Sequence, residues 1–278
     1  MKNLISRRKT RVIYVGDIPI GSGHPIPIQS MANTDPHDFS RALAQARALK
    51  AAGCEILRLT VPDREAAEVL GALKKEALGM PLVADIHFDY RLALAAIEAG
   101  ADKIRINPGN IGDKEKVRAV VDACRERQIP IRIGVNSGSL EKHIYEKYGA
   151  PTAEALAESA LYHAAFLEEL SYQNIAISVK ASDVQTMIFA NRILAEKTDY
   201  PLHLGVTEAG GGDRALIKSA IGIGALLAEG IGDTVRVSLT DDPVEEIAAA
   251  RNILASLGLA DKPEAHILSA LAQLYCQE

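Results

Sequence analysis

The sequence predicts an α/β protein, folded as a closed (β/α)8 (TIM) barrel. Short runs rich in β-branched residues alternate with longer Ala- and Leu-rich segments of helical period, and the alternation repeats eight times. The 278 residues suit one such barrel. Eight strand–helix units in this length favour a closed parallel barrel over an open doubly wound sheet. We therefore expect one barrel domain over residues 1–258.

The first segment, residues 1–25, precedes the repeats and has a different pattern. Its run RVIYVGDIPIGSGHPIPIQSM has two short apolar stretches around a Gly-Asp pair, which indicates a β-hairpin. We expect this hairpin to close the bottom of the barrel.

The strands and helices of the barrel follow in strict alternation. The candidate strands are residues 26–31, 55–60, 81–87, 102–107, 131–136, 174–180, 202–207 and 234–239. The helical patterns lie near 38–52, 63–77, 91–100, 114–127, 152–170, 182–197, 213–229 and 243–257. The start of the last helix is predicted by Asp242-Pro243 followed by Glu245 and Glu246, which supply an N-cap, a first-position proline and first-turn acids.

Residues 259–278 form a short tail after the eighth helix. Ile267, Leu268, Leu271, Leu274 and Tyr275 recur there at helical spacing. This pattern favours a terminal helix packed on the barrel over a helix that binds a partner.

Composition excludes several classes of protein. The net charge of −5 argues against a general nucleic-acid binder, although it allows a local basic pocket. Cys54, Cys124 and Cys276 lie far apart and form no CxxC pair, so neither a disulfide framework nor a local metal motif is expected. The N-terminus lacks the apolar run of a signal peptide, and no stretch is long enough to span a membrane. These features predict a soluble, cytoplasmic protein.

The alternation of side chains along the strands gives the strongest functional signal. In each strand the apolar set must face the surrounding helices, so the polar set points into the barrel. Most barrels fill this interior with branched apolar residues. Here five strands place a basic residue inward near the carboxyl end: Arg58, Arg105, Arg132, Lys180 and Arg236.

Several buried like charges need an anionic partner, because each costs several kcal/mol without one. We expect Asp85 and Glu208 to compensate in part and an anionic ligand to supply the rest. The alternative is that internal carboxylates neutralise these cations and brace the barrel. The position at the strand ends, where barrel sites lie, favours a phosphate-rich ligand.

The loops after the last two strands agree with this interpretation. Glu208-Ala209-Gly210-Gly211-Gly212 follows the seventh strand, and Arg236 and Ser238 end the eighth. These two loops form the usual phosphate site of such barrels, where backbone N–H groups hold an anion. Ser137-Gly138-Ser139, after the fifth strand, is a weaker candidate for the same role.

Three titratable positions leave alternatives open. Asp85 and His87 share a strand face, so they form either an acid–base pair or a group that orients a hydroxyl, unless Asp85 only pairs with Arg58 or Arg105. His203 begins the seventh strand and is expected to be a packed structural histidine. Lys180 suits phosphate pairing or, less simply, a Schiff-base nucleophile.

Motifs along most of the chain resemble one enzyme family. They run in order from about Arg7 to Leu257: QSMANT, VADIHFDYR, IRINPGNIG, IRIGVNSGSLE, SVKASD, PLHLGVTEAG, KSAIGIG, EGIGDTVRVSL and DPVEEI. Together they resemble the barrel domain of 4-hydroxy-3-methylbut-2-enyl diphosphate synthases, iron–sulfur oxidoreductases of non-mevalonate isoprenoid biosynthesis.

The resemblance implies a reaction and a set of site residues. The family reductively opens and dehydrates 2-C-methyl-D-erythritol 2,4-cyclodiphosphate. By resemblance, the diphosphate contacts are Arg58, Arg105, Arg132, Lys180, Arg236 and Ser238. The polyol or an ordered water would meet Asn107, Asn136, Thr207, Asp85, His87 and Glu208, and the last three of these are the catalytic candidates.

The resemblance also implies a cofactor that this sequence has no residues to hold. In the family, electrons from reduced flavodoxin or ferredoxin reach the substrate through a [4Fe-4S] cluster, bound by three cysteines and a glutamate in a C-terminal domain. Here that place holds DKPEAHILSALAQLYCQE, and Cys276 alone cannot bind a cluster. We expect no metal site in this chain alone. The chain is expected to be a shortened form, a barrel served by a cluster domain on another chain, or a binding-only relative. Its expected partner is a second copy in a homodimer or a partner cluster domain.

Overall fold

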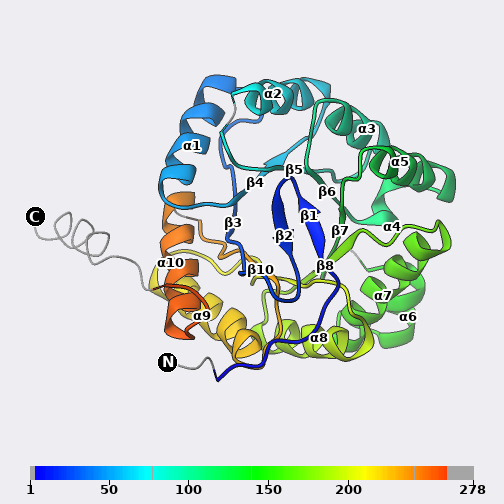
Figure 1. Cartoon of the computed structure of the whole chain (residues 1–278). Helices are drawn as coiled ribbons and strands as arrows, with labels where there is room; N and C mark the ends of the chain where they lie inside the picture. The colour runs from blue at the N-terminus through cyan, green and yellow to red at the C-terminus, as the bar shows by residue number, and fades with distance from the viewer. Residues whose placement is uncertain (1–3, 77, 139, 241, 262–278) are drawn as a thin grey trace, which may run out of the picture.

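Eight parallel strands close into a barrel inside a ring of helices (Figure 1). The computed structural model describes residues 4–76, 78–138, 140–240 and 242–261. Six of the strands form one sheet and the last two form a short pair. Parallel bridges from Ile177 to Leu202 and from Ile28 to Val235 join that pair to both edges of the sheet. The predicted barrel is therefore confirmed.

The strands follow the predicted positions, with differences at their ends. In chain order around the barrel they are β3 (Gln29–Met31), β4 (Ile56–Thr60), β5 (Leu82–Asp85), β6 (Lys103–Ile106), β7 (Ile131–Asn136), β8 (Ile175–Lys180), β9 (His203–Leu204) and β10 (Thr234–Val235). The last two are shorter than expected. Backbone hydrogen bonds continue past them, from Arg236 N to Leu204 O (3.0 Å) and from Thr207 N to Ala181 O (3.3 Å), so the chain stays close to its neighbours without a regular ladder.

Eight helices alternate with the strands and cover the outside of the barrel (Figure 1). They are α1 (Phe39–Ala51), α2 (Arg64–Lys75), α3 (Tyr90–Glu98), α5 (Lys114–Glu126), α7 (Ala153–Glu169), α8 (Val184–Lys197), α9 (Gly212–Ala228) and α10 (Pro243–Ser256). Two short helices, α4 (Pro108–Ile111) and α6 (Lys142–Tyr148), lie in loops and were not predicted, because segments of four and seven residues are too short to show a helical period.

Acidic or hydroxyl side chains begin most of the large helices. In each case the side chain of the N-cap residue accepts a hydrogen bond from a backbone N–H of the first turn, which is worth about 1 kcal/mol per helix. These caps are Asp38, Asp63, Asp89, Asp113, Thr152, Asp183 and Asp242. The N-cap of α9 is Gly211, which has no side chain to donate or accept.

The N-terminal hairpin closes the bottom of the barrel, as predicted. Strands β1 (Ile13–Val15) and β2 (Ile18–Ile20) pair in antiparallel fashion around Gly16 and Asp17 and lie across the centre of the ring in Figure 1. Their apolar side chains form one buried cluster with three inward-facing residues from the lower part of the barrel, Ile56, Val83 and Ala176. Since the hairpin seals this end, a ligand reaches the interior only from the carboxyl ends of the strands.

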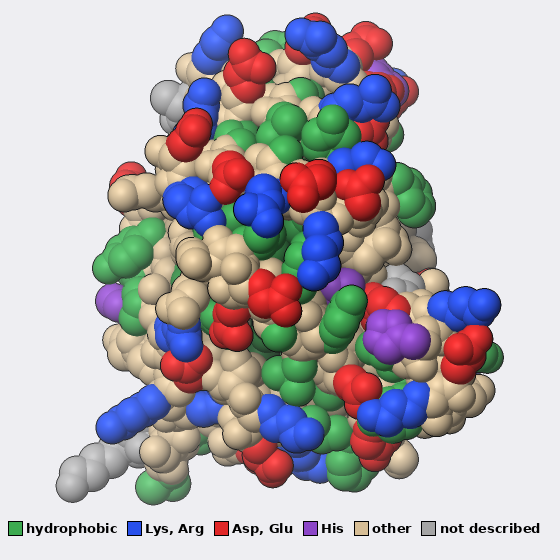
Figure 2. All heavy atoms as spheres, turned by 90° about the vertical axis from the view of Figure 1, so that its right-hand side faces the viewer, with side chains coloured by type: hydrophobic (Ala, Val, Ile, Leu, Met, Phe, Trp, Pro, Cys, Tyr) green, Lys and Arg blue, Asp and Glu red, His purple; other side chains and the backbone are tan. Residues whose placement is uncertain are grey.

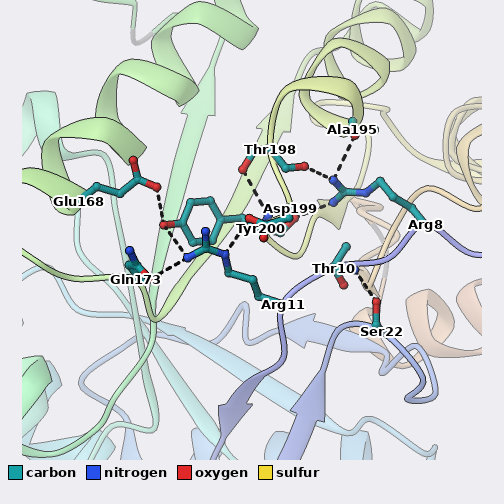
Figure 3. A network of polar contacts seen from close by, with 10 residues as sticks. All are labelled: Arg8, Thr10, Arg11, Ser22, Glu168, Gln173, Ala195, Thr198, Asp199 and Tyr200. Carbon is teal, nitrogen blue, oxygen red and sulfur yellow. Dashed lines mark hydrogen bonds and ion pairs between the residues drawn. The ribbon is translucent and has the colours of Figure 1, made fainter.

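The segment before the hairpin is bound to the end of α8 and to the loop that leads into β9 (Figure 3). Arg8 donates to the backbone carbonyls of Ala195, Thr198 and Tyr200. Arg11 pairs with Asp199 at 2.7 Å and lies over the ring of Tyr200. These polar contacts hold the hairpin on the barrel in addition to the apolar cluster that it forms with the barrel interior.

The main core lies between the strands and the helices. Leu57 and Leu59 of β4, Ile104 and Ile106 of β6, and their counterparts on other strands belong to one buried cluster with the helices. On the outer face that Figure 2 shows, acidic and basic side chains are interspersed. This face therefore shows no counterpart to the basic side chains that point into the barrel.

Two further expectations concern the membrane and the tail. In the described ranges, no helix has the length and apolar character needed to cross a membrane. The predicted helical tail, residues 259–278, falls outside the described residues except for its first three.

Candidate functional site

A basic pocket opens at the carboxyl ends of the strands. It is lined by Arg58, Arg105, Arg132, Gly134, Asn136, Ser178, Lys180, Thr207, Arg236 and Ser238. Its enclosed volume of about 70 Å³ is small. Ordinary small-molecule pockets enclose roughly 300–1,000 Å³. The pocket therefore has room for phosphate-sized groups, and the remainder of a larger ligand must lie at its mouth.

The structure brings together eight of the nine residues predicted to contact substrate. The exception is Asn107, whose side chain caps α4 by accepting from the backbone N–H of Gly109 at 3.1 Å. Two lining residues were not among the predicted contacts. Gly134 and Ser178 lie on the inner face of β7 and β8, where the same alternation that identified Arg132 and Lys180 also places them.

Asp85 is the acidic centre beneath the pocket. Its side chain is fully buried and forms ion pairs with Arg58 at 2.9 Å and with Arg105 at 3.0 Å. Burial alone would raise the pKa of Asp85, but Arg58, His87 and Arg105 together hold that pKa below its ordinary value. Asp85 is therefore an ionised partner for two cations rather than a proton donor.

Arg236 has an acid of its own, which is Glu246 on α10. The guanidinium donates to both carboxylate oxygens, at 3.2 and 3.1 Å. Glu246 is 2% exposed and also accepts from Ser30 and from the backbone N–H of Leu239. The sequence marked Glu246 only as a first-turn acid, so its role in the site was missed.

Glu208 does not supply the compensation that the sequence predicted. Its side chain is exposed, its backbone adopts a φ of +50°, and within the described chain it forms no ion pair. Glu246 pairs with Arg236 instead, because α10 reaches back across the end of β10. The expected role of Glu208 in catalysis stays a prediction.

Arg132 reaches across the barrel without meeting an acid. Its Nη1 donates to Gln29 Oε1 at 3.3 Å, so the side chain connects β7 to β3 on the opposite wall. It is 1% exposed, and no carboxylate of the described residues pairs with it. Arg132 thus forms a cationic floor to the pocket.

Lys180 is a second buried cation without an acidic partner. It is 6% exposed, lines the pocket and has no carboxylate at ion-pair distance in the part of the chain described. Burial lowers its pKa well below the ordinary value, and Arg236, Arg58 and Arg132 lower it further.

Two glycines make room for these basic side chains. A Cβ atom on Gly134 would lie 2.3 Å from Arg105 Nε, and one on Gly205 would lie 2.9 Å from Lys180 Nζ. Any larger residue would push the cation out of its place. The glycines at these strand positions therefore serve the packing of the basic side chains.

The predicted pair of Asp85 and His87 is present at the rim. His87 Nε2 lies 3.2 Å from Asp85 Oδ2, and the histidine side chain is 45% exposed. Asp85 thus contacts His87 as well as both arginines, so it does not pair with the arginines alone, and the catalytic role of the two residues stays a prediction. His203 is buried against Thr234 Oγ1 at 2.7 Å, which confirms the prediction of a packed histidine.

The glycine-rich loop after β9 does not line the pocket. The pocket residues nearest to it in sequence are Thr207 and, after β10, Arg236 and Ser238. Of the other loop candidate, Ser137-Gly138-Ser139, Ser139 falls outside the described residues.

The cysteines in the described residues do not suit an iron–sulfur cluster. Both thiols are buried, and burial raises the pKa of Cys54 to about 11 and that of Cys124 to about 12, which disfavours the thiolate that iron binds. The described part of the chain contains no group of three or more His, Cys, Asp or Glu side chains placed to hold a metal. Cys276 lies outside the described residues.

Comparison with known families decides the relationship of this chain. The family model described as the GcpE TIM-barrel domain matches residues 10–251. The chain belongs to the GcpE family. This confirms the resemblance on which the sequence interpretation rests.

Curated relatives with the synthase name are closely similar. The 4-hydroxy-3-methylbut-2-en-1-yl diphosphate synthase (flavodoxin) of Geobacter sulfurreducens is 57% identical over 256 residues, which cover 92% of this chain and 72% of the relative. The enzymes of the same name from Pseudomonas aeruginosa PAO1 and Geobacillus kaustophilus are each 56% identical, over 93% and 94% of this chain and 69% of each relative. The family is thus one of oxidoreductases.

Solved structures of other proteins share the fold alone. A type I 3-dehydroquinate dehydratase from Clostridium difficile superposes with a TM-score of 0.64 at 17% identity, covering 89% of this chain and 98% of that one. A dihydropteroate synthase from Yersinia pestis gives a TM-score of 0.60 at 12% identity, covering 89% and 98%. Both agree with a barrel architecture and carry no argument about chemistry.

Proposed function

We propose that this chain is the substrate-binding barrel of a 4-hydroxy-3-methylbut-2-en-1-yl diphosphate synthase. Its ligand would be 2-C-methyl-D-erythritol 2,4-cyclodiphosphate, which the complete enzyme opens reductively and dehydrates to the linear allylic diphosphate. The observation that carries the proposal is the pocket itself, which five basic residues line and no carboxylate lines, in a chain 57% identical to a synthase.

The charge balance supports a dianionic ligand of compact shape. Asp85 and Glu246 neutralise part of the basic charge from below, while Arg132 and Lys180 lack an acid among the described residues. A cyclic diphosphate brings one negative charge on each phosphorus and fits the small enclosed volume with its phosphate groups. Buried, charge-assisted hydrogen bonds from guanidinium groups are among the strongest that proteins make to phosphate.

Each residue of the mouth has a proposed part in binding. The phosphate oxygens would be bound by Arg58, Arg105, Arg132, Lys180, Arg236 and Ser238. The polyol would lie toward Asn136 and Thr207 at the opening, with Asn107 acting through the α4 loop that it caps.

His87 is the proposed proton donor of the reaction. Loss of water requires a proton on the departing oxygen, and His87 is the exposed titratable group next to the pocket that has a fixed partner. Asp85, ionised between two arginines, would orient the imidazole. Glu208, exposed at the rim, would approach the ligand only on its polyol side.

The electrons would come from outside this barrel. A [4Fe-4S] cluster supplies one-electron chemistry in the proposed reaction, and neither described cysteine fits as its ligand. We propose that a cluster domain on another chain acts in trans, and that reduced flavodoxin or ferredoxin in the cytoplasm donates the electrons. This chain alone would bind substrate without turnover.

A binding and complementation experiment tests the proposal. Calorimetry should show that the cyclodiphosphate binds the purified chain, with Lys142→Met, a change on the exposed face of α6, as the matched control. Adding the reconstituted C-terminal part of the Geobacter relative with reduced flavodoxin should then give the linear diphosphate. Binding without product would favour a non-catalytic diphosphate-binding relative, and absence of binding would refute the proposal.

A Schiff-base aldolase using Lys180 is the remaining alternative. It predicts that borohydride traps a covalent adduct when the chain is mixed with a phosphorylated carbonyl compound. We expect no mass increase on the peptide that contains Lys180.

A further inference from the structure

The interior below the pocket holds polar nitrogens that meet no acceptor. Gln29, Arg132 and His203 come from alternate strands and form one inward layer with Val83, as is typical of this fold. Lys103 lies in the next layer down, where Ile56 and Ala176 pack against the hairpin. Across these described layers the buried atoms without a hydrogen-bond partner are Gln29 Nε2, Lys103 Nζ, Arg132 Nε and His203 Nε2.

The barrel interior therefore has more basic groups than acids to hold their protons. Six basic side chains point inward, namely Arg58, Lys103, Arg105, Arg132, Lys180 and Arg236. The buried acids that meet these side chains, Asp85 and Glu246, are both engaged by arginines. Holding all six charges in the empty barrel would leave several cations buried together without compensation, at several kcal/mol each.

Loss of a proton from a lysine is the simplest way to reduce this uncompensated positive charge. A guanidinium binds its proton more tightly than an ammonium group by about two pH units or more, so a buried lysine loses its proton before a buried arginine does. Burial lowers the pKa of Lys103 well below its ordinary value, and Arg132 and Arg58 lower it further. A neutral Lys103 amine would supply a lone pair beside the unpaired nitrogens of Gln29 and Arg132.

Lys180 is in the same situation but lies where a ligand can change it. It lines the pocket, whereas Lys103 is sealed beneath Arg132 and beside the hairpin. The charged and titratable groups around it, from every wall of the barrel, are Arg58, Asp85, Arg105, Arg132, His203, Arg236 and Glu246. The acids among them already pair with arginines, so only a ligand can stabilise an ammonium ion at this position.

We propose that Lys180 is a neutral amine in the empty pocket and becomes an ammonium ion when the diphosphate binds, so that binding takes up a proton from solution. The amine nitrogen gains a proton from the buffer, and the ligand supplies the negative charge that holds it. This inference rests on the proposed function, because it needs a diphosphate in the pocket. It gives Lys180 a specific role: the pocket recognises an anion by protonation, which an uncharged analogue cannot trigger.

The cyclodiphosphate is a suitable probe, because each phosphorus carries one acidic oxygen that is fully ionised at neutral pH. A proton taken up on binding must therefore go to the protein. Calorimetry at pH 8 in buffers of different ionisation enthalpy measures this number directly. We expect an uptake of about one proton and an affinity that falls by up to about tenfold per pH unit between the pKa of Lys180 in the free protein and its pKa in the complex.

Two variants and a spectroscopic measurement make the test specific. Lys180→Arg keeps the charge but cannot release its proton, so it should bind without uptake, while Lys142→Met should behave as the wild type. Lysine labelled with ¹³C at Cε should show one signal that moves from the amine to the ammonium position on addition of ligand, which tests the idea even if Lys180→Arg folds poorly.

The outcomes separate this inference from the proposed function. If the cyclodiphosphate does not bind, the function fails and the inference falls with it. Binding with no dependence on the buffer, or uptake that persists in Lys180→Arg, overturns the role of Lys180 while the function stands. Uptake that is lost in Lys180→Arg and kept in Lys142→Met supports both.

Discussion

Glu246 on α10 accepts two hydrogen bonds from Arg236, at 3.2 and 3.1 Å, and so connects the outer helix to the basic pocket. The same carboxylate accepts from Ser30 Oγ at 3.0 Å and from Leu239 N at 3.1 Å. It therefore joins β3, the segment after β10 and α10 at the point where the barrel closes.

We predict that Glu246→Ala destabilises the protein by about 3–5 kcal/mol, because it leaves a largely buried arginine and two other donors unpaired. Denaturant unfolding measures the change. Glu245→Ala, one residue away and exposed, should alter the free energy of unfolding by no more than about 0.5 kcal/mol. Equal effects of the two substitutions would show that the connection contributes nothing particular.

Replacement of Arg132, unlike that of Glu246, should stabilise the protein while it weakens ligand binding. It is buried without an acid, so Arg132→Met removes an uncompensated cation and should raise the free energy of unfolding of the empty protein by about 1 kcal/mol or more. The same change should weaken cyclodiphosphate binding by about 2–5 kcal/mol, since it removes a buried charge-assisted contact. Unfolding and calorimetry on the same samples check both signs, with Arg91→Met as an exposed control. A variant that binds normally would remove Arg132 from the site.

His87 is expected to affect turnover far more than binding. In the system complemented by a cluster domain, His87→Asn should lower the rate of product formation by about 10²–10⁴-fold, the range for loss of a general acid. The dissociation constant of the cyclodiphosphate should change by less than about tenfold, because the imidazole is bound to Asp85 at the rim and lies outside the pocket lining. A loss of affinity equal to the loss of rate would assign His87 to binding instead.

The alternation of residues along the strands predicted most of this site. Arg58 and Arg105 lie between apolar neighbours that face the helices, so their inward direction follows from strand geometry alone. The boundaries of β7 matched the prediction because Ile131–Asn136 alternates without interruption between a proline and a serine.

Sequence patterns predicted less of the site where a contact depends on tertiary packing or on the backbone conformation of a loop. The pairing of Arg236 with Glu246 depends on how α10 packs over the barrel end, and a first-turn acid on a helix has the same pattern whether it is exposed or buried. The position of Glu208 after the seventh strand made it a candidate to neutralise the basic residues. The orientation of its side chain depends on a positive φ that no local sequence pattern predicts. Asn107 has the right strand face and is used as a helix cap instead.

Lys103 should make the free energy of unfolding of the ligand-free protein vary with pH in the alkaline range. Its pKa is lowered by burial and by Arg132 and Arg58, whereas in the unfolded chain it has the ordinary value of about 10.4. Between these two pKa values the unfolded state binds more protons than the folded state, so the free energy of unfolding must rise as pH increases. We predict this rise between about pH 7.5 and 9.5, where ordinary carboxylates no longer titrate. Denaturant unfolding at a series of pH values measures it.

The Lys103→Met variant should be more stable than the wild type at pH 7.5, and its free energy of unfolding should rise less steeply with pH. The methionine removes the cost of burying an amine that can be charged, and it leaves no cavity. A slope unchanged by this substitution would mean that Lys103 remains an ammonium ion inside the barrel.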